Sequence, residues 1–177
     1  LARYKLSQGS SFIGKTLLQT NFRSNYGCNI LQVSTPNQVT DMPRAEHVLQ
    51  ADSSILVIGT KEQFKMLTAA IEGKQIDLEQ VSNPLSLREF MLHDHAEAPE
   101  LRFLSLAITV DQHSKLLGKS IKDANIRENW SALVIGLERG AYTMTNPNVS
   151  LTFEKGDLLW ILGKQKMMHT LIKEEIL

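Results

Sequence analysis

The sequence predicts an α+β fold made of two copies of one small unit. The first observation is an internal repeat: residues 10 to 68 align without a gap on residues 114 to 172. The second is that each copy holds short apolar runs typical of strands and amphipathic stretches typical of helices. The third is size: 177 residues, 42% of them apolar, suffice for one medium domain or two small ones with packed cores.

Identical residues recur at the same places in both copies. Nine pairs in the aligned stretch are identical, and apolar residues follow one another in the same order between them. Two copies of one unit explain both facts most economically. The identical pairs are Ser10/Ser114, Gly14/Gly118, Lys15/Lys119, Asn21/Asn125, Arg23/Arg127, Asn25/Asn129, Pro43/Pro147, Gly59/Gly163 and Leu67/Leu171.

A strand opens each copy, at about Ala2–Leu6 and Leu101–Val110. A Gly-Lys-Thr or Gly-Lys-Ser turn follows and begins a short amphipathic helix. The apolar residues predicted for the two helices are Leu17, Leu18, Phe22 and Tyr26 in the first copy, and Ile121, Ile126 and Trp130 in the second.

The second half of each copy is rich in strand signals. It contains a buried strand, a proline-containing connection, another apolar strand that ends in glycine, and a closing helix. In the first copy these are Asn29–Val33, Ser54–Ile58 and the helix Lys61–Glu72. In the second copy they are Ala132–Leu137, Leu158–Leu162 and the helix Gln165–Ile176.

A polar segment separates the two copies. Residues 73–100 are interrupted by Asn83-Pro84 and Pro99, which is typical of a linker. Ser86 and Glu89 form a capping-box pattern ahead of three apolar residues and predict a short helix within it. The predicted organisation is therefore a first domain at 1–72, a linker at 73–100 and a second domain at 101–177.

The stretch from Gly9 to Thr16 satisfies the phosphate-loop pattern G-x-x-x-x-G-K-[ST], which would indicate a nucleotide hydrolase. The alternative is a turn in which the threonine caps a short helix. The second copy favours the turn, because it keeps Gly118-Lys119-Ser120 but has His113 where the loop needs its first glycine. We therefore expect no nucleotide hydrolysis and assign no catalytic residues, with a phosphate-loop hydrolase as the less favoured alternative.

The composition of the chain limits the kinds of partner and the environment that we expect for it. Nineteen basic and nineteen acidic residues cancel, so no overall field attracts nucleic acid. No apolar run approaches the roughly 20 residues of a membrane span, so we expect no direct membrane insertion by this chain. The presence of a single cysteine, Cys28, indicates a reducing, cytoplasmic environment, and we interpret it as a buried structural thiol. A start at Leu1 indicates a piece of a longer protein.

His93, Asp94, His95 and Glu97 could supply metal ligands within five residues. A solvated loop is the favoured interpretation, so we predict no metal site. Asp52 and Asp157 precede the last strand of each copy, and we expect them to cap backbone N–H groups in turns rather than to act in catalysis.

The ordered motifs of both copies resemble the TrkA C-terminal domain, also called the RCK C-terminal domain. In the first copy they are Gly14-Lys15-Thr16-Leu17, Phe22-Arg23 and the closing Ala-Asp-x-x-Ile-Leu-Val-Ile-Gly59. In the second copy they are Gly118-Lys119-Ser120-Ile121, Ile126-Arg127, Ala-Leu-Val-Ile-Gly136-Leu-Glu-Arg139-Gly140 and Lys-Gly156-Asp157-Leu-Leu-Trp-Ile-Leu-Gly163.

This resemblance implies a fold and a function. The family's domains are small α+β units, each an antiparallel sheet packed with short helices, and they tend to form homodimers. They are not enzymes but regulatory modules on the cytoplasmic side of the cell membrane, attached to potassium channels, potassium transporters or cation/proton antiporters. The tandem arrangement is similar to the C-terminal tails of antiporters, so the expected partner is the membrane transport domain of the parent protein.

Some family members bind cyclic di-AMP where two C-terminal domains meet, which makes it the effector to expect here. The resemblance points to the second copy, where Arg139 follows the central strand and a guanidinium can pair with phosphate. The candidate ligand residues are Arg139, Asn146 and Asn148; the first copy has Thr35-Pro36 instead. The alternatives are a structural surface arginine in a β-turn and, for the whole chain, a passive dimerisation module without a ligand.

Overall fold

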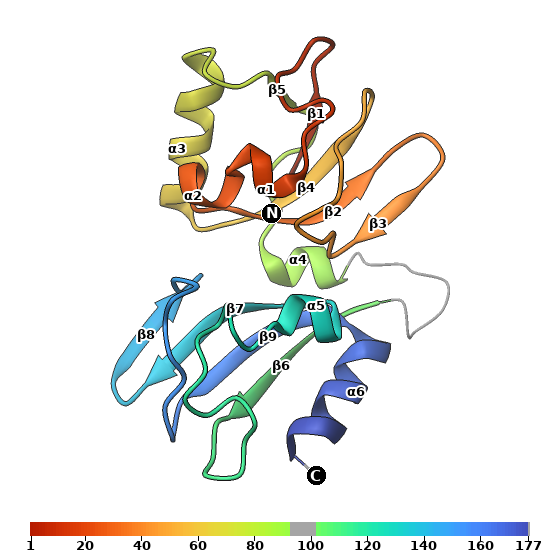
Figure 1. Cartoon of the computed structure of the whole chain (residues 1–177). Coiled ribbons are helices and arrows are strands. Elements are labelled where there is room, and N and C mark those ends of the chain that lie inside the picture. Colours follow the sequence, from red (N-terminus) through yellow and green to blue (C-terminus); the bar gives the residue numbers. More distant parts are fainter. Residues whose placement is uncertain (93–101, 177) are drawn as a thin grey trace. The chain divides into compact units, whose positions relative to one another are not determined.

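The computed structural model describes residues 1–92 and 102–176, and it divides into two compact units, Leu1–Phe90 and Met91–Leu177. Each unit contains one sheet with helices packed against it (Figure 1).

The first unit contains a five-stranded antiparallel sheet in the order β3-β2-β4-β1-β5. Alternate strand residues face a core that also takes side chains from α2 and α3. Tyr4, Ile55 and Leu67 are among its fully buried side chains. The elements are β1 (Ala2–Leu6), α1 (Leu17–Thr20), α2 (Phe22–Tyr26), β2 (Asn29–Ser34), β3 (Val39–Asp41), β4 (Ser54–Ile58), α3 (Lys61–Glu72) and β5 (Leu78–Gln80), followed by α4 (Leu87–Leu92).

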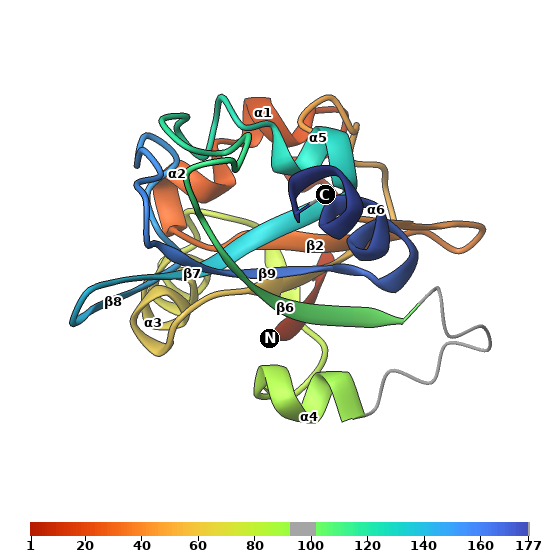
Figure 2. The same ribbon diagram turned by 90° about the horizontal axis from the view of Figure 1, so that it is seen from below.

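The second unit contains a four-stranded antiparallel sheet in the order β6-β9-β7-β8. Figure 2 shows α5 and α6 on the same side of this sheet, where Leu159, Ile161 and Leu171 form part of the core. The elements are β6 (Phe103–Thr109), α5 (Ile126–Trp130), β7 (Ala132–Arg139), β8 (Tyr142–Thr145), β9 (Leu158–Lys164) and α6 (Gln165–Ile176).

The repeat extends to irregular details of the backbone. The register between the two central strands shifts at Ile30/Gln32 in the first unit and at Val134/Gly136 in the second. Isolated bridges join Thr16 to Val48 and Ser120 to Thr152. Asn21 and Asn125 both adopt left-handed conformations, with φ of 49° and 50°. These shared irregularities confirm two copies of one unit and the predicted α+β class with antiparallel sheets.

Several predicted elements match the structure residue for residue, namely β1, β4, α3 and α6. The predicted second-copy helix over Ile121 is wrong. Its residues up to Asn125 form turns, and α5 begins only at Ile126. In the first copy the single predicted helix is two helices, α1 and α2, because Asn21 between them adopts a left-handed conformation with φ of 49°. The proline-containing connections also hold strands that the prediction missed, β3 and β8.

The segment after residue 72 contributes to the first unit. Its strand β5 pairs with β1, and Ile76 and Leu78 are buried in the first core. The short helix predicted after Ser86 is confirmed as α4: the Glu89 N–H donates to Ser86 Oγ at 3.2 Å, and the Ser86 N–H donates to the Glu89 carboxylate at 2.7 Å. The domain limits at 72 and 101 remain a prediction. Within the described residues, no helix is long and apolar enough to cross a membrane.

Candidate functional site

The Gly9 to Thr16 stretch forms a turn in which the N–H groups of the Gly-Lys pair are already hydrogen-bonded. The Gly14 N–H donates to Leu49 O at 2.8 Å, and the Lys15 N–H donates to Phe12 O at 3.1 Å. Thr16 Oγ1 accepts the Gln19 N–H at 3.2 Å and so caps α1. A phosphate cradle needs free N–H groups that point at its ligand. The geometry therefore matches the predicted strand-to-helix turn and not a nucleotide loop.

The second unit repeats this turn. The Gly118 N–H donates to Phe153 O and the Lys119 N–H donates to Leu116 O, both at 3.0 Å. Gly14 and Gly118 have φ of 80° and 78°, in the left-handed region that favours glycine. The shared glycine is therefore a backbone requirement of the turn.

Replacing Gly118 with alanine is expected to destabilise the second unit by roughly 1–2 kcal/mol, because the left-handed conformation penalises a Cβ. No heavy atom of the residues that the structure describes lies within 4 Å of that Cβ, so the cost comes from the backbone alone. Urea denaturation measures it. Gly136→Ala is the matched control, since its Cβ would meet only ordinary contacts from 3.5 Å outward. Equal losses in the two variants would contradict a backbone origin.

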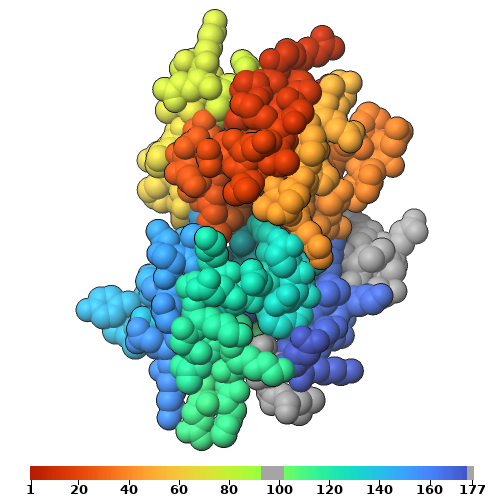
Figure 3. Space-filling view, viewed as in Figure 1, coloured from red at the N-terminus to blue at the C-terminus, as the bar shows by residue number. Residues whose placement is uncertain are grey.

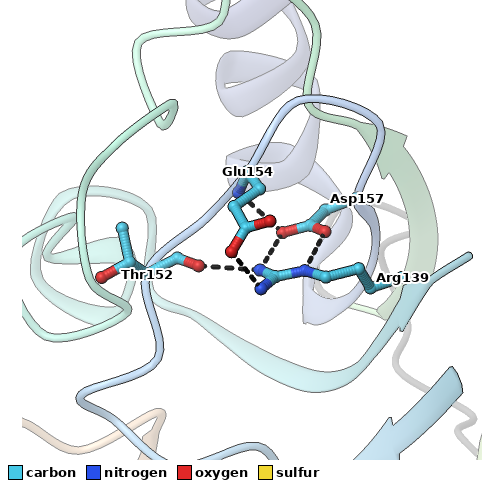
Figure 4. Close-up of polar contacts among 4 residues, drawn as sticks. All are labelled: Arg139, Thr152, Glu154 and Asp157. Carbon is cyan, nitrogen blue, oxygen red and sulfur yellow. Dashed lines mark hydrogen bonds and ion pairs between the residues drawn. The ribbon is translucent and has the colours of Figure 1, made fainter.

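Arg139 lies at the end of β7 and is held by two carboxylates (Figure 4). Its Nε and Nη2 donate to the two oxygens of Asp157 at 2.7 Å and 2.8 Å, a bidentate pair. Nη1 donates to Glu154 at 2.5 Å, and Nη2 also donates to Thr152 O at 2.8 Å. Four of the five N–H donors of the guanidinium are therefore engaged.

The Asp157 side chain is 0% exposed. Burial alone would raise its pKa, but hydrogen bonds from Arg139 and from the Glu154 N–H outweigh burial and hold the pKa below its ordinary value. The pKa of Arg139 is raised, chiefly by its hydrogen bond to Asp157. Both groups are therefore charged at neutral pH, and the pair ties the end of β7 to the start of β9.

The prediction that Asp157 caps a turn is confirmed, because its Oδ2 accepts the Glu154 N–H at 2.8 Å. For Asp52 the prediction is wrong by one residue. In the first unit the capping group is Ser53, whose Oγ accepts the Gln50 N–H at 3.3 Å, and Asp52 occupies the left-handed position of the turn with φ of 60°. Within the described residues the Asp52 side chain has no hydrogen bond.

Asn146 and Asn148 follow β8, in the connection to β9, whereas Arg139 is the last residue of β7. Asn146 follows β8 with φ of 49° and donates its backbone N–H to Ile135 O at 2.9 Å. Asn148 Oδ1 accepts from both the N–H and the hydroxyl of Ser150, at 3.0 Å and 2.9 Å. The hairpin between β7 and β8 projects from the body of the second unit, and Tyr142 beside its tip is 77% exposed (Figure 3). The ligand role of the three residues remains a prediction.

Two further predictions concern cysteine and metal. Cys28 is buried, as predicted, and burial raises the pKa of its thiol to about 12, which makes it a poor nucleophile. His93, Asp94, His95 and Glu97 lie outside the described residues. Among the described residues no three His, Cys, Asp or Glu side chains gather as metal ligands would. The absence of a metal site therefore remains a prediction.

Sequence reasoning missed Glu154 and Thr152 as partners of Arg139. A comparison of the two copies of the repeat could have identified Glu154. Arg139, Glu154 and Asp157 are all charged, whereas the residues at the same repeat positions, Thr35, Gln50 and Ser53, are all neutral. Three charges that are present or absent together indicate side chains that contact one another.

Known proteins resemble this chain over most of its length. The chain is 25% identical over 182 residues to the uncharacterized transporter YfbS of Escherichia coli (strain K12), covering 97% of this chain but only 27% of that protein. It is 29% identical over 85 residues to the probable potassium channel protein 2 of Methanocaldococcus jannaschii, covering 46% of this chain and 24% of that protein.

Among solved structures, the RCK C domain of the potassium transport protein KtrA, in complex with cyclic diadenosine monophosphate, is 25% identical. The match covers 41% of this chain and 82% of that one, with a TM-score of 0.38. The TrkA-C domain family matches residues 1–72 and 106–174, one segment in each repeat. The chain therefore belongs to the TrkA-C domain family, as a tandem pair of its domains.

Proposed function

We propose that this tandem pair is a cytoplasmic regulatory module of a membrane cation transporter, a potassium transporter or a sodium/proton antiporter. One observation supports the proposal most directly: the chain aligns over almost its whole length with about a quarter of the length of an uncharacterized transporter. The rest of such a protein supplies the transport domain, which is then the partner of the module. A match to a probable potassium channel supports a cation as the transported ion.

The module senses an anionic effector, and cyclic di-AMP is the candidate from the family resemblance. The ligand residues proposed are Arg139, Asn146 and Asn148. The Arg139 side chain is 29% exposed and, in its contacts with the described residues, leaves one N–H donor unused. Since Asn148 uses only its oxygen in the described contacts, its amide N–H groups are available. A ligand bound across a homodimer would favour one dimer geometry and pass that preference to the transport domain.

Saturating cyclic di-AMP is expected to raise the melting temperature of the chain. At 100 times Kd, a ligand that binds only the folded state stabilises it by about 2.7 kcal/mol, which is roughly 10 °C or more for a unit of this size. Thermal shift measures the effect, with AMP at the same concentration as the control. A flat response to cyclic di-AMP would overturn this effector, and a flat response to a wider ligand screen, from a chain that ultracentrifugation shows to be dimeric, would favour the alternative, a passive dimerisation module.

The other proposed properties follow from charge and loop geometry. Equal numbers of acidic and basic residues give no general attraction to nucleic acid, so no nucleic-acid partner is proposed. Hydrolysis of a nucleotide is disfavoured, because the N–H groups of Gly14 and Lys15 are bonded within the first unit. The module carries no cofactor beyond its effector in this proposal.

A further inference from the structure

We propose that Glu154 is an internal competitor that occupies the anion-binding edge of Arg139 until a ligand displaces it. This inference rests on the ligand site proposed above and adds its regulation. The ligand class is a phosphate-bearing anion, and the competing group is a carboxylate of the same unit.

The two carboxylates hold Arg139 in different ways. Asp157 is fully buried, makes two parallel hydrogen bonds to the guanidinium and also accepts the Glu154 N–H. The Glu154 side chain is 62% exposed and reaches only Nη1 of the arginine. Breaking a buried pair is costly, whereas an exposed pair contributes little. Asp157 therefore fixes the orientation of the guanidinium, and Glu154 is the partner that can leave.

The charge around Arg139 explains why displacement of Glu154 is linked to binding of an anion. One guanidinium with two carboxylates within 2.8 Å of its nitrogens carries an excess of one negative charge, which repels an approaching phosphate. When Glu154 swings into solvent, Nη1 presents two N–H donors to an anion while Asp157 still holds Nε and Nη2. A phosphate group then takes the place of the carboxylate in a charge-assisted contact.

The first unit shows that the turn does not need these charges. Its residues at the same positions are Thr35, Gln50 and Ser53, and the turn keeps the corresponding bond from the Gln50 N–H to Ser53 Oγ. If Arg139, Glu154 and Asp157 are all replaced by these neutral residues, no buried carboxylate is left without a partner. Only the second unit therefore carries the competing arrangement, and we infer one regulated anion site per chain.

Calorimetric titration of the full chain with cyclic di-AMP tests this inference. Removing the competing charge with Glu154→Gln is expected to tighten binding roughly twofold to fivefold, the range that corresponds to an exposed ion pair. Glu72→Gln is the matched control, because it removes one exposed carboxylate at the end of α3 in the other unit. It should bind like the unmodified protein. The advantage of Glu154→Gln should shrink as salt screens the repulsion.

A triple variant with Arg139→Thr, Glu154→Gln and Asp157→Ser copies the neutral set of the first unit and avoids a stranded buried charge. It should lose binding while remaining folded. If the unmodified protein binds, the triple variant does not, and Glu154→Gln binds no more tightly, the competitor role is wrong but the ligand site stands. Equal affinity in every protein overturns both site and competitor. Absence of binding in the unmodified protein and in Glu154→Gln overturns the proposed effector itself.

Discussion

Replacing Arg139 with alanine is expected to lower the free energy of unfolding of the second unit by about 3 kcal/mol, because it leaves a buried carboxylate without its partner. The Asp157 side chain is 0% exposed, whereas Arg139 is 29% exposed, which places the loss at the lower end for a broken buried pair. Tryptophan fluorescence during urea denaturation measures it selectively, since both tryptophans, Trp130 and Trp160, lie in this unit.

The double variant Arg139→Thr with Asp157→Ser is the matched control, since it removes both charges and installs the pair found in the first unit. It should recover most of the lost stability. A loss below about 0.5 kcal/mol for Arg139→Ala, as at an ordinary surface site, would show that the pair does not stabilise the fold.

The same variant should change the pH dependence of stability. The pKa of Asp157 is depressed in the folded protein, so its contribution is complete above the unfolded value of about 3.9 and is lost as the pH falls through the folded value. Without Arg139, burial raises this pKa instead, and acid then relieves the penalty by protonating the carboxyl group. The difference in free energy of unfolding between the unmodified protein and the variant should therefore begin to narrow above pH of about 4, where the variant takes up its proton, and narrow further below it as the unmodified protein loses its pair. A gap that is constant between neutral and acidic pH would contradict the assigned charge of Asp157.

Elements with a strong local pattern could be predicted from the sequence. The strand β4 is a continuous apolar run bounded by Asp52 and Gly59, and the helix α3 begins at the capping residue Thr60 and carries Phe64, Leu67 and Ile71 on one face. Local capping and periodicity specify such segments, so their bounds were right. The repeat extended the same assignment to the second copy, where the bounds of α6 were also right and β9 continues two residues beyond the predicted Leu162, to Lys164.

Short edge strands could not be predicted in this way. The strands β3, β5 and β8 have three or four residues each and few buried side chains. They are strands because a neighbouring strand offers hydrogen bonds in register: Leu78 of β5 opposes Leu6 of β1, and Tyr142 of β8 opposes Arg139 of β7. Pairing of this kind depends on tertiary structure, so local propensity carries little information about it.

The candidate site was predicted only in part for a related reason. Family resemblance singled out Arg139, and turn chemistry singled out Asp157, but nothing local links a residue at the end of β7 to one in the turn before β9. Their contact arises because β7 and β9 pair directly, with Glu138 opposite Leu158. Glu154 joins them through the turn that Asp157 itself caps. The network is a product of strand register and could be suspected from sequence only by comparing the charged and neutral copies.

Replacing Phe153 with alanine is expected to destabilise the second unit by about 3–5 kcal/mol, because truncation of a buried aromatic ring leaves a cavity. Phe153 is 1% exposed and belongs to the second core. Its backbone also holds the Gly-Lys turn, since its carbonyl accepts the Gly118 N–H at 3.0 Å and its N–H donates to Lys119 O at 2.9 Å. Urea denaturation followed by tryptophan fluorescence measures the loss.

Phe153→Leu is the matched control, because the first unit places Leu49 at this position with the same pair of backbone bonds to Gly14 and Lys15. A leucine fills most of the space of the ring, so its cost should stay near that of a volume-conserving change, less than about 1.5 kcal/mol. A large difference between the two variants assigns the loss to the cavity. Equal losses would mean instead that the aromatic ring itself, and not its volume, supports the turn, and the packing equivalence of the two repeats at this position would be wrong.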